Sequence, residues 1–206
     1  MKILEIKNLP VNDLKVIRFA RFPDDRGYFS SLYRLSDLSG LDFLSGFEIA
    51  EAGDSFSRAG VVRGLHFQWN PGQGKLVRTL SGHMVDMVLD LRRSSSTFGR
   101  LALYSMPADS GRDWDEWIWI PPGLAHGNFF LQQSHITYLM SGGYNPACEA
   151  SISPWAPDLD WSEADPEPAA EFSRLTAQGP TVSEKDRRGL SLAAWLASGP
   201  ARECGF

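Results

Sequence analysis

Groups capable of acid–base chemistry are concentrated in two short segments of the chain, Val62–Gln68 and Gly74–Arg78. These segments bring a histidine, two arginines and a lysine into what the sequence predicts as two neighbouring strands. In such an arrangement a histidine can remove a proton next to a carbonyl group. One cation can then stabilise the enolate oxygen, and further cations can hold an anionic part of the ligand. The two segments therefore indicate proton abstraction beside a ketone.

His66 is the candidate base. Because side chains alternate between the two faces of a strand, Gly64, His66 and Gln68 are expected to share one face. We therefore expect Gln68 to bind substrate beside His66. A histidine alone in a strand is more often structural, but Arg63 and Lys75 add positive charge close by. A hydrophobic core does not tolerate that charge without anions, whereas a cavity that binds an anion does.

A second histidine, His126, lies in the segment Ile120–Asn128, where a Pro-x-Gly-x-x-His turn leads into a predicted strand. This turn is typical of the second motif of metal-binding cupins. Their first motif needs two histidines separated by one residue and then a carboxylate, whereas here Gln68 follows two residues after His66. One ligand is therefore missing, and we expect no metal site.

Composition excludes several other classes of protein. The formal net charge is −5, so no bulk attraction to nucleic acid or to an anionic membrane is expected. No apolar run is long enough for a membrane span, and Met1–Leu9 does not resemble a signal peptide, so we expect a cytoplasmic protein. Two cysteines, Cys148 and Cys204, cannot form a disulfide framework or a cysteine-rich zinc site.

The apolar and turn-forming residues predict an all-β fold, an antiparallel double-sheet jelly roll, with short helices at the C-terminus. A short helix is expected at Ser36–Phe43, a loop over Trp155–Glu171 and another short helix over Leu190–Leu196. Strands are predicted at Leu14–Phe19, Tyr28–Tyr33, Val61–Trp69, Gly74–Ser81, His83–Asp90, Leu101–Met106, Glu116–Ile120, Gly127–Leu131 and Ile136–Ser141.

Domain organisation follows from a change in composition near Pro154, after which proline, alanine and acidic residues dominate. We expect a jelly-roll domain over residues 1–160 and a C-terminal extension over residues 161–206, in which a loop and a short helix pack back on the domain.

Several segments in register make the chain similar to the nucleotide-sugar 3,5-epimerase family typified by dTDP-4-dehydrorhamnose 3,5-epimerase. They run in family order over about residues 1–155, and Ser183–Asp186 extends the match into the tail. The segments are Asp25–Phe29, Val62–Gln68, Gly74–Arg78, Val88–Arg93, Thr97–Gly99 and Trp119–Gly127.

The resemblance implies a jelly-roll homodimer that acts on a nucleotide-linked 4-keto-6-deoxy sugar in deoxysugar and polysaccharide biosynthesis, without metal or organic cofactor. An exchange of N-terminal strands between subunits is expected by the same analogy. His66 corresponds to the catalytic base, and Asp186 to the carboxylate that orients it. Tyr138 corresponds to the acid on the opposite sugar face, and Lys75 to the cation near the C4 oxygen.

The resemblance also implies a set of binding residues. Tyr144 corresponds to the aromatic residue that stacks on the base, and other positions that contact substrate or nucleotide correspond to Arg26, Arg63, His126, Glu149 and Lys185. Three contacting positions differ from the family pattern. Ser31 replaces a glutamate, and Glu51 and Gly53 replace Gln-x-Asn. The substrate is expected to be dTDP-linked, but these changes leave the nucleotide and the final sugar open.

The expected chemistry suits these residue types. C3 and C5 flank the C4 ketone, which acidifies their protons; His66 removes one and Lys75 stabilises the enolate. Tyr138 then reprotonates the carbon from the other face, since a base without an opposing acid would exchange the proton without inversion. Asp186 must fold back onto His66 across a long stretch of sequence.

Two alternatives remain open from the sequence. One is a ketoisomerase of the same fold, which moves the carbonyl between C3 and C4 and needs no acid in the position of Tyr138. The other is a metal-dependent cupin or a non-catalytic sugar-binding cupin. The missing histidine pair argues against the former, and the presence of Tyr138, Lys75 and Asp186 argues against the latter.

Overall fold

The computed structural model describes residues 1–161 and 164–204 of the chain. The strands are β1 (Ile3–Asn8), β2 (Lys15–Asp24), β3 (Gly27–Ser30), β4 (Glu51–Ser57), β5 (Val61–Gln68), β6 (Lys75–Ser81), β7 (His83–Asp90), β8 (Leu101–Pro107), β9 (Trp114–Ile120), β10 (Leu124–Phe130), β11 (Ser134–Met140), β12 (Glu149–Ser151) and β13 (Thr181–Val182). The helices are α1 (Leu35–Leu38), α2 (Pro166–Ala177), α3 (Glu184–Arg187), α4 (Leu192–Ala197) and α5 (Gly199–Glu203), with 3-10 turns η1 (Asp42–Leu44) and η2 (Pro146–Cys148). In the part of the chain that the structure describes, no helix is long and apolar enough to cross a membrane.

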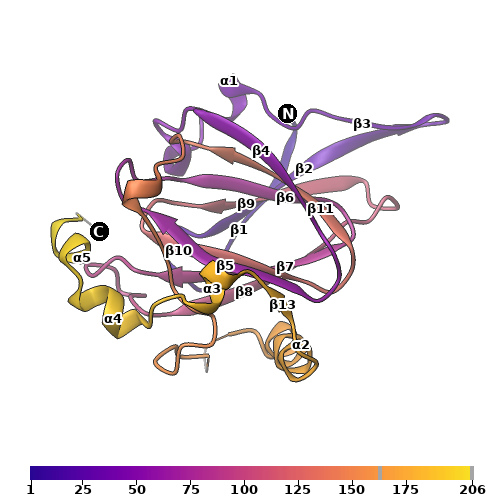
Figure 1. The fold of residues 1–206 in the computed structure, drawn as a ribbon. Helices are drawn as coiled ribbons and strands as arrows, with labels where there is room; N and C mark the ends of the chain where they lie inside the picture. Colours follow the sequence, from indigo (N-terminus) through magenta and orange to yellow (C-terminus); the bar gives the residue numbers. More distant parts are fainter. Residues whose placement is uncertain (162–163, 205–206) are drawn as a thin grey trace.

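Two sheets face each other across the molecule (Figure 1). One is seven-stranded, with the order β1-β2-β9-β6-β11-β4 and with β3 paired to β2. The other is six-stranded, with the order β12-β5-β10-β7-β8 and with the short β13 running parallel to β5. The other strand pairs within the two sheets are antiparallel, which confirms the predicted double-sheet jelly roll.

Strand β7 shows why the chain contains such long apolar runs. Met84 and Val88 point between the sheets, where they cluster with Ile118 of the facing sheet. Val85 and Leu89 point to the outer face and belong to a second cluster, which includes the C-terminal helices. Because both faces of the strand are covered, its sequence is apolar at nearly every position, and the polar exceptions are therefore informative.

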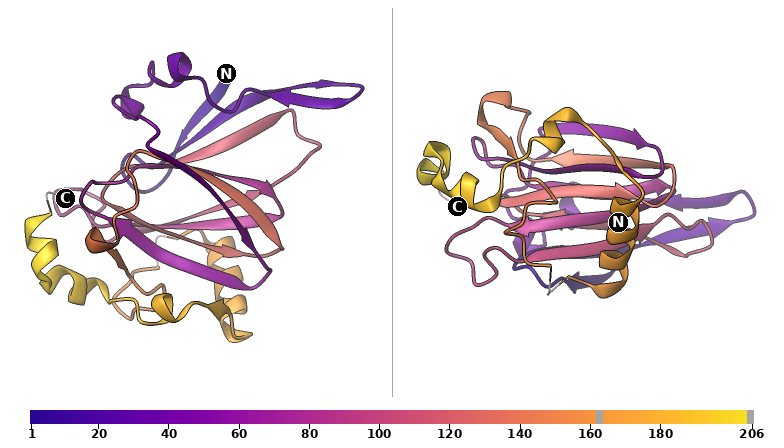
Figure 2. Two further views of the ribbon diagram at one scale, coloured as in Figure 1. Left: turned by 45° about the horizontal axis from the view of Figure 1, so that its top comes forward. Right: turned by 60° about the horizontal axis from the view of Figure 1, so that its bottom comes forward.

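The C-terminal segment covers the outer face of the six-stranded sheet (Figure 2). Trp195 of α4 contacts Phe67 of β5, with ring centroids 4.6 Å apart, and Phe172 of α2 lies 5.3 Å from Phe129 of β10. The C-terminal segment therefore shares an apolar cluster with the strands. The boundary at residue 160 stays a prediction.

Helix α2 contradicts the predicted loop over Trp155–Glu171, which is wrong in its last part. The side chain of Asp165 caps the helix by accepting a hydrogen bond from the Glu167 amide, and a proline occupies the first turn. Acidic residues and proline are favoured at helix N-termini, but in composition they resemble a loop. Phe172 and Leu175 provide the buried side of the helix.

Four strands, β1, β4, β12 and β13, have no counterpart among the predicted elements. β4 is an edge strand of small and polar residues in which intermediate and exposed side chains alternate before a buried Ser57. An edge strand of this composition lacks the apolar alternation that predicts strands. The helix predicted at Ser36–Phe43 is instead two separate short turns, α1 and η1, interrupted around Gly40.

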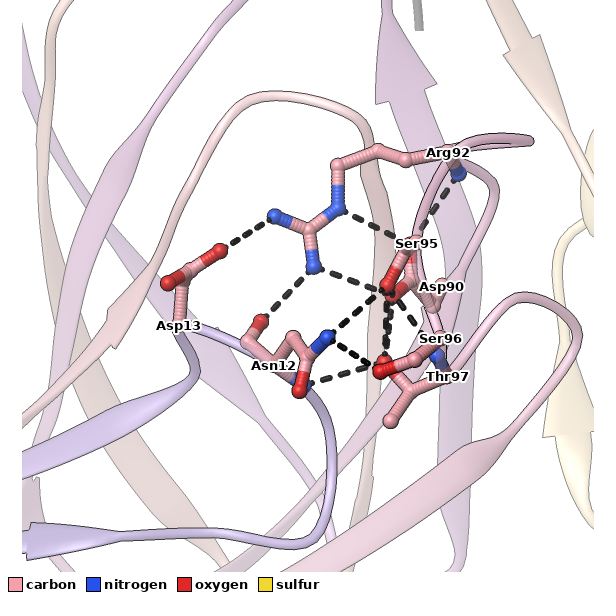
Figure 3. Close-up of polar contacts among 7 residues, drawn as sticks. All are labelled: Asn12, Asp13, Asp90, Arg92, Ser95, Ser96 and Thr97. Carbon is pink, nitrogen blue, oxygen red and sulfur yellow. Dashed lines mark hydrogen bonds and ion pairs between the residues drawn. The ribbon is translucent and has the colours of Figure 1, made fainter.

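A buried carboxylate, Asp90, ties the loop after β7 to the connection between β1 and β2 (Figure 3). Asp90 is 0% exposed and accepts hydrogen bonds from Arg92 at 2.9 Å, Ser95 at 2.7 Å and Thr97 at 2.6 Å. Arg92 also reaches Asp13 at 2.8 Å. Burial acts to raise the pKa of Asp90, but the hydrogen bonds outweigh burial and the pKa is lowered.

We expect Asp90→Ala to lower the free energy of unfolding by about 3 kcal/mol, because the substitution leaves the partly buried Arg92 without its main partner. The depressed pKa adds a pH dependence. The contribution of Asp90 is complete above the unfolded pKa of about 3.9 and is lost as the pH falls through the lower folded pKa. Urea unfolding at neutral and acid pH measures both effects.

The matched control for this prediction is Glu171→Ala, which removes an ion pair with Arg174 on the surface of α2. Exposed pairs contribute less than about 1 kcal/mol. Equal losses of unfolding free energy in the two variants would contradict the role given to Asp90.

Candidate active site

The candidate site lies between the sheets, on the inner faces of β5 and β10 and of the facing strands β6, β11 and β4. In the strand register His66 of β5 opposes His126 of β10, and Arg63 opposes Asn128. Two steps along β10 therefore correspond to three along β5, so β5 bulges. As a result Arg63, rather than Gly64, shares the inner face with His66, and the predicted face containing Gly64 is wrong.

Gly64 explains the bulge physically. Its backbone has a φ of +99°, and a Cβ atom at this position would lie 2.6 Å from the Cα of Gly127 on β10. A side chain fits neither the conformation nor the contact. Glycines on both strands thus allow the backbones to approach closely and turn Arg63 and His66 toward the same space.

His66 is held by a carboxylate from the C-terminal segment. Its Nε2 lies 2.6 Å from Oδ1 of Asp186, which is 3% exposed. Pairing of Val182 with Val62 places the start of α3 beside β5, and Ser183 caps that helix by accepting from the Asp186 amide. Burial acts to raise the pKa of Asp186, but the bonds from His66 and Ser183 lower it overall. The predicted long-range contact is therefore present, and Asp186 is poised to hold the His66 ring.

A second histidine–carboxylate pair lies one strand away. His126 Nε2 is 2.5 Å from Oδ1 of Asp86, a β7 residue that is 0% exposed. Burial lowers the pKa of His126, and the charge of Asp86 opposes this shift. The other carboxylate oxygen of Asp86 has no hydrogen-bond partner among the described residues. Asp86 was not among the residues predicted from the sequence, although a lone carboxylate at an inward position of an apolar strand was a usable signal.

Lys75 and Tyr138 approach from the facing sheet. Burial lowers the pKa of Lys75 to about 8, against the opposing charges of Glu149 and Asp86. Burial also raises the pKa of Tyr138 to about 12, and the charge of Asp86 acts in the same direction. The Tyr138 ring lies edge-on to His126, with centroids 6.4 Å apart. Tyr138 is therefore protonated at neutral pH, as an acid must be. The pKa of Lys75, by contrast, lies close to neutral pH.

Tyr144, Glu149 and Lys185 form a connected group near this site. Glu149 on β12 accepts a hydrogen bond from Tyr144 Oη at 2.8 Å and forms an ion pair with Lys185. Glu51 at the start of β4 accepts from the Tyr144 amide at 2.9 Å. Tyr144 itself is 61% exposed, so its ring is available to a ligand.

Gln68 has its side chain engaged with the protein rather than free. It donates to the carbonyl groups of Pro71 at 3.0 Å and Gly143 at 3.1 Å and accepts from the Asn145 amide at 2.7 Å. In this structure Gln68 therefore fixes the loop that carries Tyr144. Its predicted contact with substrate stays a prediction.

Two of the residues implied by the resemblance lie apart from this group within the single chain. Arg26 is at the tip of the β2–β3 hairpin, which extends away from the rest of the molecule (Figure 1), and its side chain is 89% exposed and paired with Asp24. Ser31 follows β3 directly. Gly53, by contrast, is in the site and pairs with Tyr138 in the register of β4 and β11.

The described residues contain no group of three or more histidine, cysteine, aspartate or glutamate side chains arranged to hold a metal ion. The chemistry that this arrangement supports is acid–base chemistry. His66 with Asp186 belongs to one sheet and Tyr138 and Lys75 to the other, and the charge of Asp86 acts on both Tyr138 and Lys75.

Comparisons with known proteins all indicate the same family. A family model described as dTDP-4-dehydrorhamnose 3,5-epimerase matches residues 8–194. The Pseudomonas aeruginosa protein of that name is 32% identical over 195 residues, which covers 92% of this chain and 97% of the relative. The Streptomyces griseus protein of that name is 36% identical over 173 residues, which covers 82% of each chain.

Solved structures agree with these relatives. A 4-keto-6-deoxy sugar epimerase from the novobiocin biosynthetic gene cluster of Streptomyces spheroides is similar with a TM-score of 0.80 and 28% identity, over 97% of this chain and 92% of that one. The dTDP-6-deoxy-D-glucose-3,5-epimerase of Legionella pneumophila, in complex with dTDP-4-keto-L-rhamnose, has a TM-score of 0.76 and 29% identity, over 92% and 93% of the chains. The family indicated by the sequence motifs is thereby confirmed, and this chain belongs to the dTDP-4-dehydrorhamnose 3,5-epimerase family.

Proposed function

We propose that the protein inverts C3 and C5 of a dTDP-linked 4-keto-6-deoxy sugar. The observation that carries this proposal is the placement of a histidine–aspartate pair and a protonated tyrosine on opposite sheets. His66 is held by Asp186 at 2.6 Å and opposes His126 in the strand register, and the Tyr138 ring on β11 of the other sheet lies 6.4 Å from the His126 ring. A base and an acid on opposite sides of a sugar ring are what inversion requires, whereas a ketoisomerase needs no such opposing acid.

In the proposed reaction His66 takes the proton from C3 or C5, and the electrons of that C–H bond form the enolate of the C4 ketone. Lys75 stabilises the oxyanion. Tyr138 then transfers its phenolic proton to the same carbon from the other face, and the ketone re-forms. The high pKa of Tyr138 keeps the proton available, and burial strengthens the interaction of Lys75 with the developing charge.

The first test is proton NMR of the protein with dTDP-4-keto-6-deoxyglucose in D₂O. We expect deuterium to enter C3 and C5, and the trapped product to have the L configuration. His66→Ala should lower deuterium uptake at both carbons by about 10²–10⁴-fold, because the base is lost. His83→Ala is the matched control, since His83 contacts Ser105 on β8 and takes no part in the site.

Deuterium at C3 alone would instead indicate a 3-epimerase. Uptake only with GDP- or CDP-linked substrates would identify a different nucleotide, a reasonable outcome given Glu51 and Gly53. No uptake with any of the three, or full uptake by His66→Ala, would overturn the proposal.

The pKa of Lys75 predicts a pH dependence. Only the protonated amine stabilises an oxyanion, and its pKa is about 8, so kcat/KM for deuterium uptake should fall as the pH rises above about 8. Lys75→Arg retains the charge at high pH and should abolish this basic limb. Lys75→Met should lower uptake by about 10²–10³-fold below pH 8, with a smaller difference from the wild type at higher pH, where the wild-type amine is itself neutral. A basic limb unchanged in Lys75→Arg would remove Lys75 from this role.

We also propose that the protein is a homodimer formed through the N-terminal strands. Apolar side chains are unusually exposed there, with Phe29 of the β2–β3 hairpin 68% exposed and Leu4 of β1 49% exposed. Exposed apolar groups concentrated on one region are typical of a subunit interface. A partner subunit in this position would also give the exposed guanidinium group of Arg26 a binding partner outside its own chain.

Light scattering should therefore give twice the chain mass of 22.9 kDa. Phe29→Asp should shift the protein toward the monomer, because it places a charge in the interface. Phe98→Asp, at a 38% exposed position on the loop after β7, should leave the mass unchanged. A monomeric wild-type protein would contradict the dimer without affecting the proposed chemistry.

A further inference from the structure

Tyr144, which the family resemblance places against the nucleobase, follows two consecutive glycines, Gly142 and Gly143. A Cβ atom built on Gly143 would meet nothing within 4 Å, so no neighbouring group restrains this residue sterically. Glycine has more conformational freedom to lose on folding than any other residue. The backbone before Tyr144 therefore does little by itself to fix the position of the ring, and other groups must do so.

Two side chains bind three backbone groups around Tyr144. The amide nitrogen Nε2 of Gln68 donates to the carbonyl of Gly143 at 3.1 Å, and its oxygen Oε1 accepts from the Asn145 amide at 2.7 Å. Glu51 accepts from the amide of Tyr144 itself at 2.9 Å. Gln68 ends β5 of the six-stranded sheet, and Glu51 begins β4 of the seven-stranded sheet. We call Gln68 and Glu51 the loop clamp, because they hold the tyrosine backbone from both sheets.

The hydroxyl end of Tyr144 is held as well. Its Oη donates to Glu149 at 2.8 Å, and Glu149 is the cross-strand partner of Gln68 in the pairing of β12 with β5. The ring between these two anchored ends is nevertheless open, since Tyr144 is 61% exposed. An aromatic face that is both accessible and fixed in place is well suited to stacking on a planar base.

Gln68 has no donor left for a ligand. It is 4% exposed, and the second hydrogen of its Nε2 group is directed to the carbonyl of Pro71 at 3.0 Å. An amide nitrogen has two hydrogens, and both are used within the protein. Gln68 lies two residues after His66 on the same strand. It therefore links the strand of the proposed base to the loop that carries Tyr144.

We propose that the loop clamp, Gln68 with Glu51, consists of positioning residues that preorganise Tyr144 for the base of a nucleoside diphosphate. The inference deepens the proposed function and rests on it for the class of substrate. With the clamp in place, the nucleotide binds to a loop that is already ordered. Without it, the loop must be ordered during binding, and this cost lowers the affinity.

The test is isothermal titration calorimetry of the protein with dTDP, with GDP and CDP in parallel; the variants are compared on the nucleotide that the wild type binds most tightly. Gln68→Met keeps the length of the side chain and removes its hydrogen bonds, so Kd should rise about 10- to 100-fold. Glu51→Ala should raise Kd about 3- to 10-fold, and Glu51→Gln, which retains an acceptor oxygen, should restore most of the affinity. Gln133→Met, in the exposed turn before β11, is the matched control and should leave Kd unchanged.

A double variant distinguishes positioning from direct contact. Tyr144→Ala is the reference in which the ring is absent. If Gln68 acts through Tyr144, the double variant Gln68→Met/Tyr144→Ala should bind the nucleotide as weakly as Tyr144→Ala alone. A further loss of affinity in the double variant would assign Gln68 to the ligand or to the fold and overturn the inference.

Turnover provides a second readout. In Gln68→Met, KM should rise by a larger factor than kcat falls, because the clamp acts on nucleotide binding. A fall in kcat larger than the rise in KM would indicate displacement of the nearby His66 and would overturn the inference.

The failure of this inference and the failure of the proposed function can be told apart. An unchanged Kd in either Gln68→Met or Glu51→Ala would overturn the loop clamp and leave the proposed function intact. Binding of none of the three nucleotides by the wild type would also overturn the clamp. Clamp-dependent binding of dTDP by a protein that takes up no deuterium would instead support the clamp and overturn the proposed function.

Discussion

The contact between His66 and Asp186 depends on most of the fold. Asp186 reaches the histidine only because β13 pairs with β5 and α3 begins directly after it. That path in turn requires the C-terminal segment to lie against the outer face of the six-stranded sheet, where Trp195 packs on Phe67. Apolar packing on the outer face therefore positions the Asp186 carboxylate, which contacts His66. Loss of this packing, even far from the site, should displace the carboxylate from the histidine.

The space between the sheets is divided by chemistry. Apolar residues such as Met84, Ile118 and Phe130 fill part of this space, and the ionisable groups form a second region that adjoins them. Asp86 is central to the second region, because its buried charge acts on His126, Lys75 and Tyr138 together. A low-dielectric environment makes one carboxylate effective over several neighbours.

Two of the three positions that differ from the family pattern, Glu51 and Gly53, lie beside Tyr144 and Tyr138, whereas Ser31 lies apart after β3. Glu51 fixes the backbone at Tyr144, and Gly53 leaves the strand neighbour of Tyr138 without a side chain. In the proposed reaction, proton removal by His66 and proton return by Tyr138 thus involve different residues. This separation allows the outcome at each carbon to change while the base, its aspartate and the lysine are retained.

The sequence by itself determined the family, the double-sheet fold and the identity of the proposed base, acid and lysine, because glycine-punctuated apolar strands and motifs in register are local signals. It did not determine the helix α2 or the polar edge strand β4, whose local patterns resemble loops. It also did not show which groups Asp86 faces, because His126, Lys75 and Tyr138 come from other strands. The tertiary structure decided those contacts and turned Arg63 toward His66, because a bulge caused by close backbone approach at Gly64 breaks the alternation that sequence patterns assume.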